Sequence, residues 1–370
     1  MKYVFVVQGE GRGHFTQALA MKDMLVGQGH KVLAVLVGKS STRELPVFFT
    51  NKIGVPVYTF DSPNFLPTPK GRQPNILKSA LKNILSFPRF VRSIFFIKKK
   101  IDRYSPDFVI NFYELMTGLT YFLTSPQSRM ICIGHQYMFL HKRFIFPKSS
   151  FLSLFFLRFF TRLTCLGAIK KLALSFYDAG DDIENGIRVV PPLLRQEVFK
   201  ARISSGDYIH GYMLNNGYVE DLQSWHKLHP NEKLHFFWDK RNVSDLLCES
   251  PNFYLHKIDD TLFLKYMSGC KAYATTAGFE SVCEAMYMGK PILMVPTHIE
   301  QTCNAFDAQK IGEGIVADYF NLNILLDFLP QYKYDTSFKR WVESSELLFL
   351  RHITDVAADD VCKYSNPAFV

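Results

Sequence analysis

The chain has 370 residues, long enough for two domains that each bury a core of their own. Hydrophobic residues make up 48% and charged residues 21%, which excludes a disordered protein. The net charge is +9, and the excess basic residues are interleaved with Phe and Leu, which argues against a nucleic-acid partner. Seven cysteines, an odd number with no CxxC pair, argue against a disulfide framework and a structural zinc site.

The N-terminus begins with an apolar strand and a glycine-rich turn. Lys2–Val7 is too short an apolar run for a signal peptide, so we expect a cytoplasmic protein. Gln8–His14 (QGEGRGH) follows, and Phe15–Val26 has helical spacing. The glycines do not have the G-x-G-x-x-G spacing, and the next strand, Lys31–Val37, ends without an acidic residue to hold a ribose. Both observations argue against dinucleotide binding.

Two basic, phenylalanine-rich segments come next. Ile84–Ile101 looks helical and ends in three lysines, and Phe144–Phe176 has no acidic residue. Arg158 and Arg162 lie in the most apolar part of the second segment, and each would cost roughly 2.5–3.5 kcal/mol at a membrane centre, which argues against a spanning helix. Two interpretations stay open: contact with the surface of an anionic membrane, or a pair of core helices whose arginines reach solvent.

Strand-like and helix-like segments alternate along the chain, which predicts an α/β protein with parallel sheets. In the first half we expect further strands at Val55–Phe60, Phe108–Phe112 and Met130–Gly134. The second half has five candidates: Tyr208–Leu214, Leu234–Trp238, Phe253–His256, Ala272–Thr275 and Ile292–Val295. The Pro-containing, polar stretch Val189–Ser205 separates the two series. We therefore expect an N-terminal domain over residues 1–200, a C-terminal domain over 201–340, and a tail over 341–370.

The segment Thr275–Ala305 is the most informative part of the chain. A turn of small residues follows a strand and precedes a helix, and the free N–H groups of the turn and of the helix start favour a phosphate. The candidate residues are Thr275, Thr276, Ala277, Gly278 and Phe279. Glu284, in that helix, is suited to accept hydrogen bonds from a ribose. Glu300 and Gln301 follow the next strand, at the edge where open α/β sheets bind ligands. Together these residues predict a nucleotide-sugar site.

This segment resembles the donor-binding signature of GT-B glycosyltransferases, especially the MurG-like and UDP-glycosyltransferase groups. The resemblance implies two Rossmann-like parallel-sheet domains facing across a cleft, with the tail crossing back to the N-terminal domain. It assigns the diphosphate to Thr276 and Gly278, the ribose to Glu284, and the hexose to Glu300 and Gln301. Because relatives more often have Asp or Gln where this chain has Glu300, the sugar stays open. The resemblance also implies a UDP-linked donor, no permanently bound cofactor and no required metal ion.

In the same families the N-terminal turn points into the cleft. Gly11 and Gly13 would then lie near the donor phosphates. His14 is the natural candidate for the general base, because an imidazole titrates near the working pH. Glu10 competes for this role, and His14 could instead be a helix-terminal residue bonded to backbone.

Several other positions are weaker candidates. The backbone of Asn216 could line the cleft, and the main chain of Ile258 corresponds to the group that reads uracil in MurG-like enzymes. Asp260 is expected to cap the helix Thr261–Met267. Three residues that follow N-terminal strands are candidates for the acceptor site: Glu114, His135 and Gln136.

The sequence thus predicts an inverting glycosyltransferase that moves a sugar from a nucleotide sugar to an acceptor hydroxyl. The expected acceptor is a glycan or glycolipid, such as a lipid-linked or cell-envelope glycan, and the expected location is the cytoplasm, at the inner face of the cell membrane. Two alternatives share the fold. A sugar-nucleotide 2-epimerase would need no acceptor, and a non-catalytic nucleotide-sugar-binding subunit would tolerate the loss of His14. The oligomeric state is left open.

Overall fold

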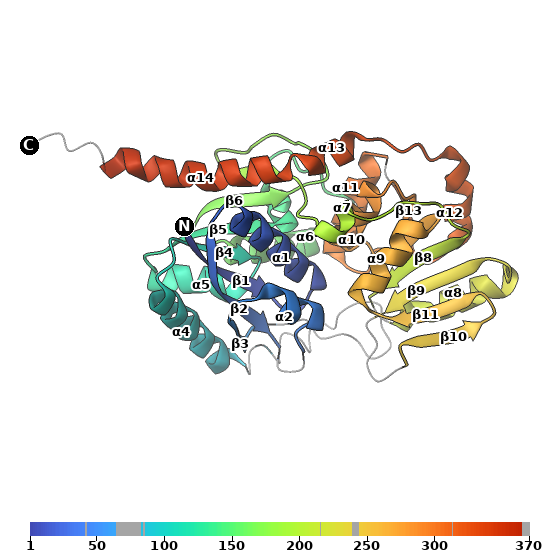
Figure 1. Cartoon of the computed structure of the whole chain (residues 1–370), viewed down its shortest axis with the longest axis horizontal. Helices are drawn as coiled ribbons and strands as arrows, with labels where there is room; N and C mark the ends of the chain where they lie inside the picture. Colours follow the sequence, from blue (N-terminus) through green and yellow to red (C-terminus); the bar gives the residue numbers. More distant parts are fainter. Residues whose placement is uncertain are drawn as a thin grey trace, which may run out of the picture.

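The computed structural model in Figure 1 describes residues 1–40, 43–63, 83, 86–214, 216–238, 244–312 and 314–364. Two seven-stranded sheets lie side by side, each covered by helices. The first sheet has the order β3-β2-β1-β4-β5-β6-β7 and the second the order β10-β11-β9-β8-β12-β13-β14. All neighbouring strands run parallel except β10 and β11.

The N-terminal sheet is buried on both faces, which is why its central strands are continuous apolar runs. In β1 (Lys2–Gln8) and β4 (Phe108–Phe112), every residue from Tyr3 to Val7 and from Phe108 to Phe112 is buried. The other strands are β2 (Lys31–Lys39), β3 (Val57–Asp61), β5 (Arg129–Gly134), β6 (Ala168–Leu174) and β7 (Ile187–Val190). The helices of this domain are α1 (Arg12–Gly27), α2 (Val47–Ile53), α4 (Phe87–Tyr104), α5 (Leu115–Thr124), η1 (His135–Leu140) and α6 (Phe151–Thr164).

The segment Phe144–Phe176 is not the pair of core helices that we considered. It forms one helix, α6, and then strand β6 inside the first sheet. Helix α6 buries only Thr161 and Thr164 and exposes most of its phenylalanines. Within the described ranges, no helix is long and apolar enough to cross a membrane. The expected helix Ile84–Ile101 is α4, which runs from Phe87 to Tyr104; residues 84 and 85 lie outside the described residues.

The C-terminal sheet contains all five strands expected for it, as β8 (Tyr208–Met213), β9 (Lys233–Trp238), β11 (Phe253–Lys257), β12 (Ala272–Thr275) and β13 (Ile292–Met294). The sequence did not predict β10 (Leu246–Ser250) and β14 (Gly314–Val316), which form its two edges. Its helices are η2 (Asn216–Tyr218), α8 (Val219–Leu228), α9 (Asp260–Gly269), α10 (Phe279–Tyr287), α11 (Ile299–Lys310), α12 (Leu322–Phe328) and η3 (Leu329–Gln331).

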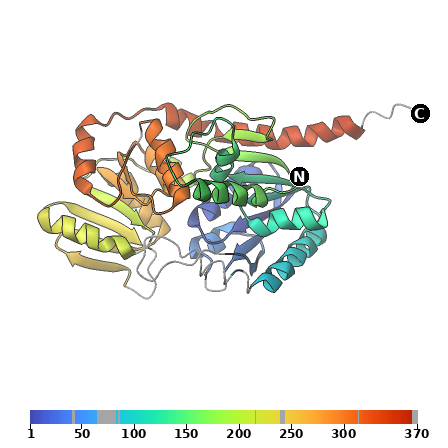
Figure 2. The ribbon, with the colours of Figure 1, turned by 180° about the vertical axis from the view of Figure 1, so that it is seen from behind.

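Two further segments connect the domains. The chain passes from β7 to β8 through the short helix α7 (Gln196–Phe199). At the end of the chain, α13 (Ser337–Glu343) and α14 (Ser345–Tyr364) lie along the N-terminal domain, as Figures 1 and 2 show from opposite sides. The Trp341 indole donates a hydrogen bond to the Ser175 carbonyl at 2.9 Å, and the Lys170 ammonium donates to the His352 carbonyl at 2.7 Å. The end of the chain therefore packs back against the N-terminal domain.

Candidate active site between the domains

The turn that precedes α10 leads into a helix start without a side-chain cap, although the Thr276 N–H itself already donates to the Tyr212 carbonyl at 3.3 Å. Ala277 has a left-handed conformation with φ of 60°, and Gly278 is the N-cap residue, which provides no side-chain cap. The first N–H groups of α10 therefore have no acceptor within the helix, and an αL residue beside them forms a concave group of donors suited to an anion. The Asn304 amide donates to the Ala277 carbonyl at 3.4 Å and so fixes the turn to α11. The Thr276 hydroxyl is buried and has no hydrogen-bond partner among the described residues.

Glu284 is buried one and a half turns along α10 and binds an arginine that the sequence did not reveal. Arg195 donates from Nε and Nη2 to the two Glu284 carboxylate oxygens, at 2.6 and 3.1 Å, and from Nη1 to Asp260. Burial raises the pKa of Glu284, and Arg195 opposes that rise. The predicted ribose acceptor is thus already engaged as half of a bidentate ion pair.

The expected capping role of Asp260 is wrong by one residue. The Asp259 carboxylate caps α9 by accepting a hydrogen bond from the Leu262 N–H at 2.8 Å. Asp260 is the first helical residue, and its side chain turns toward Arg195. Because both residues are Asp and adjacent, the sequence could not distinguish the cap from its neighbour.

Glu300 and Gln301 begin α11 beside the N-terminal domain. The Glu300 Oε1 lies 3.3 Å from the His135 Nε2 and accepts a hydrogen bond from the Gln136 amide at 3.1 Å. Burial alone would raise the pKa of Glu300, but His135, with smaller contributions from His298 and His14, lowers it to about 2. The structure therefore brings the predicted sugar-binding residue together with two of the acceptor-site candidates.

Gln301 is oriented by its neighbour. Its carbonyl oxygen accepts hydrogen bonds from the Thr297 N–H at 2.9 Å and from the Thr297 hydroxyl at 2.7 Å. The amide nitrogen is consequently the end of Gln301 that can donate to a ligand.

His14 lies in the first turn of α1, almost fully buried. Its ring stacks on Tyr113 with centroids 6.0 Å apart, and its Nδ1 lies 3.3 Å from the Gln17 Oε1. Burial lowers the pKa of His14, although the charges of Glu280 and Glu300 act in the opposite direction. Glu10, the competing candidate, directs Oε1 to the Ser40 N–H at 2.6 Å, away from this cluster.

The first turns of α1 and α10 meet across the two domains. A Cβ atom on Gly13 would lie 2.1 Å from the Glu280 Oε2, so the absence of a side chain at Gly13 permits this approach. The Gln17 amide donates a hydrogen bond to the Glu280 Oε1. Neither Gln17 nor Glu280 was a candidate from the sequence. An acidic residue in the first turn of a helix is ordinary, so Glu280 did not stand out.

The remaining candidates have structural roles or lie elsewhere. The N–H of Gly11 donates to the Gln8 Oε1 at 3.3 Å, and the N–H of Ile258 donates to the Trp238 carbonyl at 3.1 Å. Asn216 begins η2, and its side chain is outside the described part. Glu114 caps α5, and burial raises its pKa to about 7. In the described part of the chain, no group of three or more metal-ligating side chains comes together.

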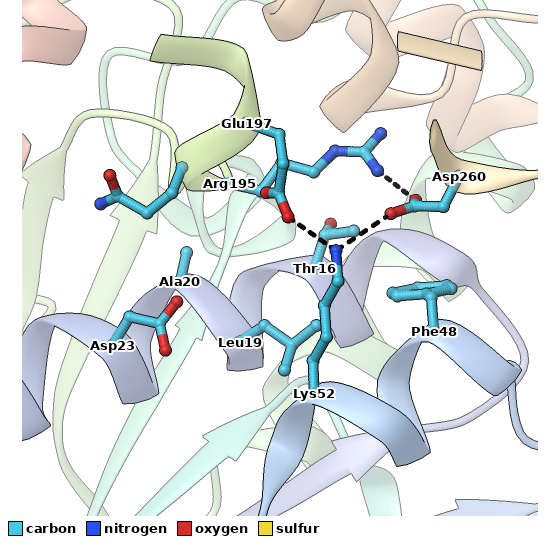
Figure 3. A pocket seen from close by; sticks show the side chains of 10 residues that line it. Thr16, Leu19, Ala20, Asp23, Phe48, Lys52, Arg195, Glu197 and Asp260 are labelled. Carbon is cyan, nitrogen blue, oxygen red and sulfur yellow. Dashed lines mark hydrogen bonds and ion pairs between the residues drawn. The ribbon is translucent and has the colours of Figure 1, made fainter. Parts of the chain in front are cut away.

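A cavity of about 250 Å³ lies beside the Arg195–Glu284 pair, between α1, α2, α7 and α9 (Figure 3). In Figure 3 the Lys52 side chain rises from α2 to Glu197 at 2.6 Å and to Asp260 at 3.6 Å. Asp260 thus joins Lys52 of the N-terminal domain to Arg195, which holds Glu284. Charged groups of both domains therefore surround this cavity.

Comparison with known proteins establishes the class. A family model described as glycosyl transferase family 1 matches residues 1–332, and the chain belongs to this family. The protein is a glycosyltransferase, and the GT-B fold expected from the sequence is confirmed. No curated protein matches the chain.

Three solved structures illustrate the likeness of fold. The spinosyn forosaminyltransferase SpnP is 13% identical over 97% of this chain and 99% of its own, with a TM-score of 0.62. UGT2 of Phytolacca americana, solved with UDP-2fluoro-glucose and pterostilbene, is 12% identical over 97% and 99%, with a TM-score of 0.61. SnogD from Streptomyces nogalater is 14% identical over 96% and 99%, with a TM-score of 0.59.

Proposed function

We propose that this glycosyltransferase uses a UDP-linked sugar as donor and transfers it to an acceptor hydroxyl with inversion at the anomeric carbon. The observation that carries the proposal is the uncapped turn Thr275–Gly278, which meets the first turn of α1, and hence His14, across the domains. Fixed N–H dipoles at this turn would stabilise the charge that develops on the leaving diphosphate. The structure of UGT2 with UDP-2fluoro-glucose shows that another protein of this fold binds such a donor.

The other donor contacts follow from the geometry. The Thr276 hydroxyl would donate to a phosphate oxygen, and Glu300 with the Gln301 amide nitrogen would bind sugar hydroxyls. Glu284 would bind the ribose after releasing one oxygen from Arg195. Because the first turns of α1 and α10 are in contact beside the proposed phosphate site, the domains would have to separate to admit the donor.

The chemical step would be a single displacement. The His14 Nε2 takes the proton of the acceptor hydroxyl while the acceptor oxygen bonds to the anomeric carbon. The bond from that carbon to the diphosphate oxygen breaks, and UDP leaves with the bonding electron pair. Burial keeps His14 neutral and able to accept a proton near neutral pH.

Acceptor-dependent release of UDP tests this function. The protein is incubated with UDP-sugars, with and without hydroxyl-bearing acceptors, and NMR reports the anomeric configuration of the product. We expect UDP release only with an acceptor and inversion of the configuration. Conversion of the UDP-sugar to its epimer without acceptor would instead identify a 2-epimerase, and binding without turnover would identify a non-catalytic subunit.

We also propose that the acceptor is a lipid-linked or envelope glycan and that the protein lies at the inner face of the cell membrane. The support is the outer face of α6, where Phe151, Leu152, Phe155, Phe156 and Phe159 are all exposed, by 79% for Phe151. Their spacing places them on one side of the helix, and Arg162 continues the same side. No acidic residue occurs from Leu115 to Tyr177.

Neighbouring helices extend this basic and aromatic surface. Figure 2 shows α6 (green), α5 and α4 (turquoise) adjacent on the near side. On α4, Arg92, Phe95 and Lys99 are exposed along one side. Each basic residue near an anionic lipid surface contributes about 1 kcal/mol to the free energy of membrane binding. Two copies of this basic face, by contrast, would repel each other. The inner side of α6 approaches the site, because the Thr161 hydroxyl bonds at 2.8 Å to Tyr113, on which His14 stacks.

Vesicle sedimentation tests the membrane contact. We expect the protein to bind vesicles that contain phosphatidylglycerol, to lose binding in high salt, and to bind at least tenfold more weakly as the double variant Phe155→Ser/Phe159→Ser. Leu228→Ser removes an apolar side chain of α8 that is more exposed than either phenylalanine, and this variant should bind as the parent does. Equal binding by the double variant, or self-association that this variant abolishes, would contradict a membrane role for this face.

A further inference from the structure

The orientation of the Gln17 amide is fixed from the opposite domain. Its nitrogen donates to the Glu280 Oε1, and its oxygen lies 3.3 Å from the His14 Nδ1. A carboxylate accepts hydrogen bonds only, so a flipped Gln17 would direct its oxygen against the Glu280 oxygen and lose this hydrogen bond. Gln17 is fully buried, so no water could compensate for that loss.

The orientation of Gln17 in turn determines which nitrogen of His14 carries the proton. Because only the Gln17 oxygen faces the imidazole, the Nδ1 of a neutral His14 must be the donor in this contact. The Nε2 then has the free lone pair. The Tyr113 ring, stacked on His14 at 6.0 Å, keeps the imidazole in this plane.

We propose that Gln17 and Glu280 are positioning residues that hold His14 as its Nδ1–H tautomer, so that the general base is ready only when the two domains are in contact. This inference rests on the proposed role of His14. Gln17 belongs to α1 of the N-terminal domain and Glu280 to α10 of the C-terminal domain, 263 residues later in the chain. Domain separation for donor entry would break the Gln17–Glu280 hydrogen bond, and closure would restore it.

Gly13 provides independent support for this contact. Gly13 lies in a helix and has an ordinary negative φ, so the backbone conformation does not require a glycine at this position. Its Cα instead packs against the Glu280 carboxylate, where a Cβ would lie 2.1 Å from Oε2. The close approach that allows Glu280 to reach Gln17 thus depends on the glycine.

Nitrogen NMR of ¹⁵N-histidine-labelled protein tests the tautomer without requiring activity. The parent should give the shift pair of an Nδ1–H, Nε2-unprotonated ring for His14, assigned by its absence from His14→Gln. Gln17→Leu and Glu280→Ala should each lose this pattern in favour of a tautomer mixture. An Nε2–H ring in the parent, or an unchanged pattern in both variants, would overturn the proposal.

Kinetics provides the second readout. Gln17→Leu and Glu280→Ala should lower kcat by about tenfold to a hundredfold with little change in KM for the donor, because the base is affected and the donor contacts are not. A matched control exists on the same helix: the Gln28 amide donates to the Glu346 Oε1 at 3.2 Å, between α1 and α14. Gln28→Leu should leave kcat and the His14 shifts unchanged; an equal loss there would show that any α1 contact has this effect. If the tautomer responds but no transferase activity is found, the positioning stands and the proposed function fails.

Discussion

Replacing His14 with alanine is expected to lower kcat by about 10²–10⁴-fold, the usual contribution of a positioned general base, while UDP still binds. His14 is buried beside Glu280 and Glu300, at the point where the two domains meet. The His135 ring, by contrast, lies against Glu300 and Phe279. Steady-state kinetics of UDP release, together with UDP titration of the variant, measures the two effects separately.

The pH profile provides a check on the same residue. A base must be unprotonated, and burial lowers the pKa of His14 from 6.5, so kcat/KM should rise with pH and reach half of its maximum below pH 6.5. His30→Ala, at the surface end of the same domain, serves as the control and should retain both rate and profile. A large loss in Glu10→Gln with full activity in His14→Ala would make Glu10 the base instead.

Removing the Glu284 carboxylate is expected to have the largest effect on stability. Glu284→Ala leaves Arg195 buried without its bidentate partner, and breaking a buried ion pair in this way costs about 3–5 kcal/mol in the free energy of unfolding. Asp260 still contacts Arg195, so the lower end of this range is expected. Urea unfolding at fixed pH measures the change.

A second ion pair beside the same cavity, Lys52–Glu197, provides the matched control. Glu197→Ala removes the partner of Lys52, but both side chains of that pair are 44–47% exposed, so the loss should stay below about 1 kcal/mol. Replacing both members, as Arg195→Met/Glu284→Leu, should recover most of the stability lost in Glu284→Ala. Equal destabilisation by the Glu284 and Glu197 variants would mean that the Arg195 pair is solvated and contributes little.

Much of the fold could be predicted because buried parallel strands have a clear pattern. The runs that became β1, β4 and β12 are mainly apolar and end at turns. Charged residues interrupt the apolar run in β6, which contains Lys170 and Lys171, and in β7, which contains Arg188, and β14 is a partly exposed edge strand. Helix α6 left two interpretations open for another reason: its apolar side faces outward, whereas apolar periodicity normally marks the side that is buried.

Part of the candidate site could likewise be predicted from the sequence, and part could not. The turn before α10 and the start of α11 are local features, and their candidates could be proposed from short segments. Arg195 reaches Glu284 from 89 residues away, and Gln17 reaches Glu280 from 263 residues away. Such contacts are created by the packing of the two domains, and no local pattern around Arg195 or Gln17 distinguishes them from surface residues.

Binding of nucleotides tests the central claim, that the turn Thr275–Gly278 receives the diphosphate of a UDP-sugar. Thermal unfolding is measured with a panel of nucleoside diphosphates, for the parent and for Thr276→Val. A ligand at a hundred times its Kd stabilises the folded state by about 2.7 kcal/mol, so UDP should raise the Tm selectively and the variant should respond less. The same Tm for the parent with and without every nucleotide would contradict the claim.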